Sequence, residues 1–173
     1  MLPMIDLRIE HLPRQIGIGQ PFPIRVEIRN PGHQSIFVVP ESTTFQDRRS
    51  PICQLEMRRV GDKTWINVSR HPDCGNTDPI NLRDFQELAP GKKMMVTGDF
   101  YWSPQLQESL KAHPGDYEIR FIYNTSAPIG EWIGGPIPEP QHTDREQEIL
   151  PRFTLVPKGI FQSRPVRVRF VAG

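Results

Sequence analysis

The sequence predicts an all-β fold in which two antiparallel sheets pack face to face. Apolar and polar residues alternate with a period of two in most of about eight short segments, as expected for strands with one buried face. The 19 prolines and 13 glycines among 173 residues disfavour a helical fold, because proline removes a helix hydrogen bond. The predicted elements show no strand–helix–strand alternation. The length suits a single domain spanning 1–173.

The first half of the chain contains five predicted strands, at 5–10, 24–29, 35–39, 54–60 and 64–70. In the first two, isoleucine, leucine or valine alternates with a charged residue. The third is a short apolar run, consistent with a strand buried on both faces. The last two are the arms of a predicted hairpin around Gly61-Asp62-Lys63.

The second half contains three further strands, at 92–100, 117–123 and 166–171, and one short helix. The helix is predicted to begin at Ser103-Pro104, since serine is a favoured N-cap and proline suits the first helical position. Leu106 and Leu110, four residues apart, bury one stripe of this helix. The last strand pairs with its predecessor in this interpretation.

Residues 124–161 form a long proline-rich insertion before the last strand. They contain six prolines and an acidic stretch at 139–148. Pro136, Pro138 and Pro140 favour extended polyproline backbone, so we expect this part of the insertion to project. A connection of this length is usually functional or disordered.

Trp132 is the most conspicuous residue of the insertion, next to Ile133 and two glycines. Two interpretations are open. Trp132 anchors a partner, as aromatic residues on end loops often do, or it plugs the open end of the sandwich. The first interpretation makes a contact surface of five residues: Trp132, Ile133, Pro136, Ile137 and Pro138.

Three short motifs resemble those of immunoglobulin-like and fibronectin type III-like domains. The run Leu110…His113-Pro114-Gly115-Asp116-Tyr117 resembles the Leu…Pro-Gly-x-Tyr pattern that opens their penultimate strand. Residues 24–32, a strand ending in Asn-x-Gly, are similar to the second strand of many bacterial members, and Leu88-Ala89-Pro90-Gly91 is similar to the turn into their fifth strand. The resemblance implies an immunoglobulin-like sandwich and a tyrosine corner, in which the Tyr117 hydroxyl bonds back to the preceding backbone.

The resemblance concerns the fold and carries no chemistry. The disulfide and central tryptophan of antibody domains are missing at the corresponding strands. What remains is a generic sandwich, a fold shared by adhesion modules, chaperones, protease inhibitors and accessory domains of enzymes.

The cysteines Cys53 and Cys74 flank the predicted hairpin. Folding the hairpin brings them near each other, so a disulfide is expected in an oxidising compartment and two thiols in a reducing one. His71 and Asp73 add zinc donors to this region, but no second Cys-x-x-Cys pair follows, and we predict no metal site.

The remaining composition argues against several classes of function. A formal net charge of +1 favours neither nucleic acid nor anionic lipid, and no apolar run reaches the roughly 18–20 residues of a membrane helix. The sequence has no Gly-x-Ser-x-Gly nucleophile motif and no paired carboxylates on one strand face. We therefore predict no catalytic residues and no cofactor. Charged residues among the first eight fit a native cytoplasmic start at Met1 or the trimming of a leader.

These features lead to one main hypothesis and two alternatives. The main hypothesis is a non-enzymatic module that binds another protein through its end loops and the 124–161 insertion. The alternatives are a protease inhibitor of immunoglobulin-like fold and an accessory domain of a larger enzyme.

Overall fold

The computed structural model describes residues 4–10, 12–40, 50–69, 80–134 and 137–173. Its strands are β1 (Asp6–Glu10), β2 (Gln15–Gly17), β3 (Pro23–Arg29), β4 (Ile36–Val38), β5 (Ile52–Arg59), β6 (Ile66–Asn67), β7 (Gln86–Leu88), β8 (Lys93–Asp99), β9 (Gly115–Asn124), β10 (Ile160–Gln162) and β11 (Val166–Val171). Its helices are α1 (Pro104–Ala112), α2 (Ile129–Trp132), α3 (Gln141–Phe153) and the 3-10 turn η1 (Leu82–Asp84). The prediction of a mainly-β fold is confirmed, and each of the eight predicted strands overlaps an observed one.

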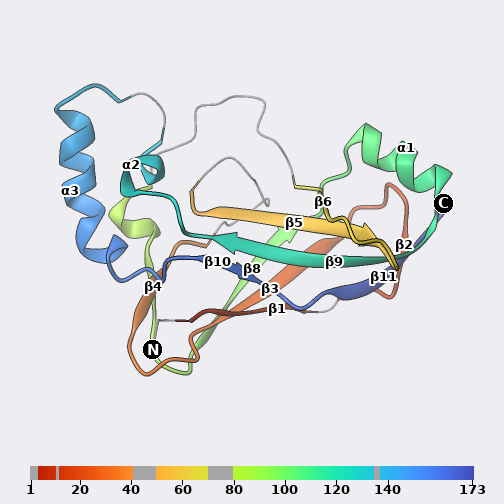
Figure 1. Cartoon of the computed structure of the whole chain (residues 1–173), viewed down its shortest axis with the longest axis horizontal. Helices are drawn as coiled ribbons and strands as arrows, with labels where there is room; N and C mark the ends of the chain where they lie inside the picture. Colours follow the sequence, from red (N-terminus) through yellow and green to blue (C-terminus); the bar gives the residue numbers. More distant parts are fainter. Residues whose placement is uncertain (1–3, 11, 41–49, 70–79, 135–136) are drawn as a thin grey trace.

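Two sheets form the body of the molecule (Figure 1). One has the strand order β1-β3-β8, and the other has the order β2-β11-β9-β5-β6, with β10 also pairing β9. The predicted neighbours 117–123 and 166–171 do pair antiparallel, with Val166 opposite Ile119 and Val168 opposite Tyr117. β4 and β7 form a separate two-stranded sheet.

The core lies between the two larger sheets, as the alternation predicts. Ile24, Val26 and Ile28 of β3 have no exposed surface, and neither have Ile119 and Phe121 of β9. All belong to one apolar cluster with residues of β1, β5 and β11. Burying these apolar side chains away from water is the main favourable contribution that this cluster makes to folding.

The connection from α1 into β9 follows the sequence signals. The Ser103 side chain accepts a hydrogen bond from the backbone N–H of Leu106, which confirms the predicted N-cap. Leu106 and Leu110 are buried beneath the helix. The Tyr117 hydroxyl donates to the carbonyl of His113 at 2.7 Å, and burial raises the pKa of Tyr117, so the hydroxyl stays protonated as a donor.

The insertion differs from the prediction, because it contains helices α2 and α3 where we expected one short helix in the whole chain and an extended proline-rich segment. The prolines that suggested extension end at Pro140, the N-cap residue of α3. Residues 141–150 contain neither proline nor glycine, and Pro151 lies in the last turn, so the proline-free run before it can form regular helix. No helix in the described part of the chain is long and apolar enough to cross a membrane.

Candidate functional site

The insertion packs around a second apolar core at one end of the sheets. Trp132 lies at its centre, stacked on Phe85 with ring centroids 6.1 Å apart and edge-to-face with Phe153 at 5.1 Å. The other buried members come from both the insertion and the segments before β8: Val39, Ile80, Ile133, Ile149 and Val156. Helices α2 and α3 are therefore held by a packed core of their own, separate from the cluster between the sheets.

Hydrogen bonds connect this second core to the sheets. The backbone N–H of Val39 donates to the Tyr123 hydroxyl at 3.0 Å, and Tyr123 belongs to the core between the sheets. The backbone N–H of Ile80 donates to the Trp132 carbonyl, and that of Thr125 donates to Gly159. The insertion thus lies in a defined position at the end of β9.

Lys158 closes the second core on its solvent side. Its ammonium nitrogen lies 3.0 Å from the Phe153 ring centroid and 4.7 Å from that of Trp132, a cation–π arrangement. Lys158 is exposed as a whole residue, but its ammonium is held against the rings, and burial lowers its pKa to about 8. The Trp132 indole N–H is buried and has no hydrogen-bond partner among the described residues.

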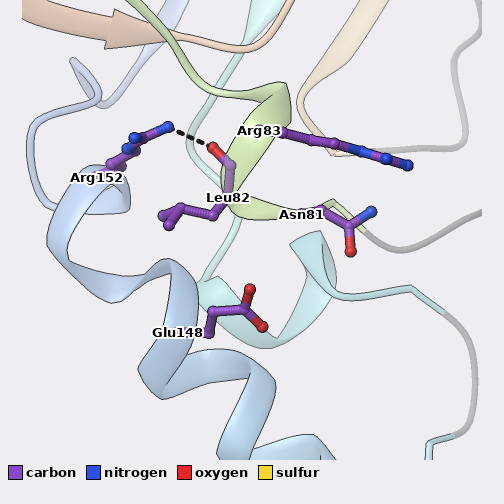
Figure 2. Close-up of a pocket in the computed structure, with 5 residues that line it drawn as sticks. All are labelled: Asn81, Leu82, Arg83, Glu148 and Arg152. Carbon is purple, nitrogen blue, oxygen red and sulfur yellow. Dashed lines mark hydrogen bonds between the residues drawn. The ribbon is translucent and has the colours of Figure 1, made fainter.

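A surface pocket of about 560 Å³ lies where α3 meets η1. Figure 2 shows Arg152 reaching from α3 to the carbonyl of Leu82, at 2.6 Å, while Arg83 extends away from that helix. Asn81, Leu82, Arg83, Glu148 and Arg152 line the pocket. We call this set the α3–η1 pocket.

The chemistry of the α3–η1 pocket suits binding of charged and polar groups. Its lining offers two guanidinium groups, one carboxylate and one amide, which can form ion pairs and hydrogen bonds with a partner. Arg152 is committed to the η1 carbonyls, so Arg83 and Glu148, both exposed, are the groups available to a partner.

The structure separates the five predicted contact residues. Trp132 and Ile133 are 1% and 0% exposed, and Ile137 packs against the same core. Pro138 is exposed, and Pro136 lies outside the described residues. The burial of Trp132 agrees with the alternative in which it plugs the end of the sandwich. A partner-binding role for Trp132 and Ile133 stays a prediction. In this structure both side chains lie in the second core, beneath the surface of the insertion.

The residues of the α3–η1 pocket were not predicted from the sequence. Glu148 and Arg152 are four residues apart on α3. This helix was not predicted, because the nearby prolines favoured extended backbone. The signal that could have found η1 is Asn81-x-x-Asp84, because the Asp84 carboxylate accepts from the backbone N–H of Asn81 at 2.7 Å, one half of a capping box.

The predicted disulfide falls partly outside the described residues. Cys53 is buried in the core between the sheets, whereas Cys74 and its neighbours His71 and Asp73 are not described. The disulfide therefore stays a prediction. Within the described ranges, no group of three or more His, Cys, Asp and Glu side chains is placed to hold a metal ion.

Comparisons with known proteins identify no family. No family model matches the sequence, and no curated protein matches it. Among solved structures, the chain is similar to a β-glucosidase from Listeria innocua in complex with laminaribiose, with a TM-score of 0.38 and 12% identity over 98% of this chain. A β-glucosidase from Erythrobacter marinus gives a TM-score of 0.35 and 13% identity over 98% of this chain. The chain spans 16% of the length of these enzymes, and likeness at this level carries no argument about function.

Proposed function

We propose that the chain is a non-enzymatic binding module of immunoglobulin-like fold that contacts another protein through its helical insertion. The strand order supports the fold. In chain order, β1, β3, β5, β6, β8, β9 and β11 take the places of strands A, B, C, C′, E, F and G, which gives the sheets A-B-E and G-F-C-C′. The Tyr117–His113 hydrogen bond has the form of the tyrosine corner of this family.

The position of the insertion supports the binding role. It joins the strands that correspond to F and G, and the loops at one end of such sandwiches are where variable domains bind their ligands. Helix α1 lies at the opposite end of the molecule from α2 and α3 (Figure 1).

The observation that carries the proposal is the second core around Trp132. A sandwich closes without it, since the core between the sheets has its own members. The insertion nevertheless packs around one tryptophan, three phenylalanines and several aliphatic residues, and so presents the α3–η1 pocket on a rigid support. Rigid presentation lowers the entropy lost on binding, which is the physical advantage of such a structure in a binding module.

A charge-swap experiment tests the proposal. The tagged chain is used to capture proteins from the source cells, and captured proteins are identified by mass spectrometry. The test variant carries Arg83→Glu and Glu148→Arg, which inverts the pocket charges at constant net charge. The matched control carries Glu108→Lys and Lys111→Glu, an exposed pair on α1 at the other end. We expect the test variant to lose the wild-type partner and the control to retain it.

Two results would contradict the proposal. One is a partner retained equally by both variants, which would place the contact elsewhere. The other is loss of the partner by the control variant alone, which would place it at the α1 end. Circular dichroism of both variants shows whether the fold is intact before the capture results are compared.

A further inference from the structure

The strand β1 is an open edge of the β1-β3-β8 sheet. Within the described residues it pairs with β3 along all five of its positions and is hydrogen-bonded to no strand on its other side. An edge strand presents unpaired main-chain N–H and C=O groups to solvent. Such an edge can accept an additional strand from another chain, a mode in which main-chain hydrogen bonds supply affinity.

A groove of about 630 Å³ runs along this edge. It is lined on one side by Asp6, Leu7, Arg8 and Ile9 of β1, and on the other by Arg164 and Val166 at the start of β11. Leu7 and Ile9 are each 5% exposed, because their side chains point into the core. At these two positions β1 therefore offers the groove mainly its main chain.

The outward side chains of β1 carry an alternating charge order. Asp6, Arg8 and Glu10 lie opposite Arg29, Glu27 and Arg25 of β3 in the antiparallel register, so each facing pair has opposite signs. Opposite charges directly across a pair of strands stabilise the pairing, and like charges destabilise it. A strand on the open side of β1 meets the same three charges and has to supply the same order, basic, acidic and basic at alternate positions.

The same charges argue against a second copy of the chain as the occupant. A symmetric antiparallel pair of β1 strands that uses all five residues is centred on Arg8. It places Arg8 opposite Arg8 and Asp6 opposite Glu10, so that every outward pair has like charges. A segment of a different protein can therefore match the charges along this groove better than a second copy of β1 can.

We propose that β1 accepts an extended segment of another protein as an added strand, and that this segment carries basic, acidic and basic residues at alternate positions. The site is separate from the α3–η1 pocket and does not depend on the function proposed there. Its partner is a peptide segment in extended conformation whose alternate, inward-facing side chains are small or apolar enough to lie beside Val166.

The probe is the synthetic peptide FPIRVEIRN, which copies residues 22–30 and so carries the charge order that β1 already faces. It is titrated into the isotope-labelled full chain, and backbone amide resonances are followed by NMR. We expect shifts at β1 and at the 164–166 segment, and slower hydrogen exchange of the β1 amides that point away from β3. The peptide FPIEVRIEN, with inverted charges, is expected to bind about tenfold more weakly.

Exchanging charges between β1 and the peptide tests the recognition more stringently. The variant Arg8→Glu should lose affinity for FPIRVEIRN and regain it for FPIRVRIRN, in which the acidic residue is replaced by arginine. The variant Lys111→Glu on α1 has the same change in net charge and should behave as wild type. If Arg8→Glu does not fold, two N-methylated forms of FPIRVEIRN replace it. In one form the methyl groups block the amides that would pair with β1, and in the other they block the amides that point away from β1. Only the second form should bind.

Three outcomes would overturn the proposal. The first is the absence of shifts at β1 with the peptide at millimolar concentration. The second is equal binding of FPIRVEIRN and FPIEVRIEN, which would remove the charge order from the recognition. The third is a dimer of the chain in sedimentation that Arg8→Glu dissociates, which would identify a second copy as the occupant.

Discussion

The Tyr123 hydroxyl is hydrogen-bonded to both main-chain groups of Val39, accepting from its N–H at 3.0 Å and donating to its carbonyl at 3.3 Å. Tyr123 belongs to the core between the sheets and Val39 to the second core, so this one side chain joins the two. The residues are 84 positions apart in the chain. The contact therefore links the core between the sheets directly to the second core, on which the α3–η1 pocket lies.

Replacing Tyr123 by phenylalanine should loosen the second core. The substitution leaves the buried N–H of Val39 without its partner, which costs about 1–3 kcal/mol of unfolding free energy. Urea unfolding measures that loss. Hydrogen exchange should show faster exchange of α2 and α3 amides, with β3 and β8 little changed; uniform acceleration across all elements would contradict the proposed link.

Tyr117→Phe provides the matched comparison. It removes the 2.7 Å hydrogen bond to His113 but leaves the ring in the core, and should cost about 1 kcal/mol. Because His113 ends α1 at the other end of the molecule, exchange should accelerate near α1 and the start of β9 while α3 is unaffected. A larger effect on α3 than on α1 would contradict this assignment.

Trp132 can be tested as the centre of the second core by two substitutions of different size. Trp132→Ala leaves a large cavity and should cost about 3–5 kcal/mol. Trp132→Phe keeps an aromatic ring and also removes a buried N–H that lacks a partner among the described residues, so its cost should be clearly smaller. Equal losses in denaturant unfolding would contradict the prediction that an aromatic ring at this position preserves most of the core.

The ammonium of Lys158 should make stability depend on pH in the alkaline range. Its pKa of about 8 in the folded chain lies below the ordinary 10.5, so between these values the unfolded chain binds more protons. Stability from this group therefore rises as pH increases through that window and is constant below it. The unfolding free energy of wild type minus Lys158→Met should rise between pH 8 and 10.5, with Lys111→Met correcting for the loss of one lysine. A flat difference would contradict the lowered pKa.

The strands could be predicted because burial on one face imposes a two-residue alternation that is visible in the letters. Tyr117, Ile119 and Phe121 are buried as that pattern requires. The Ser103 cap was also predictable, since it depends on residues close together in the sequence, and the Tyr117 hydrogen bond was implied by the resemblance to immunoglobulin-like domains.

Burial of Trp132 was one of the two interpretations of the sequence, but the rest of the second core could not be predicted, because its members come from distant segments. Ile80 and Phe85 precede β8, whereas Ile149 and Val156 belong to the insertion. The clustered prolines led to a prediction of extended backbone in place of α3, although the cluster ends at Pro140, before the first helical residue. Without α3 in the prediction, Arg152 and Glu148 could not be placed beside η1, and the α3–η1 pocket had no local signal.

We propose that the insertion end is the surface that binds a protein partner. Hydrogen exchange of the chain, measured alone and in complex with the protein it captures, tests this most directly. We expect slowed exchange on binding to be concentrated in residues 80–85 and 141–153. Protection confined to α1 and the hairpin between β5 and β6, with α3 unchanged, would contradict it.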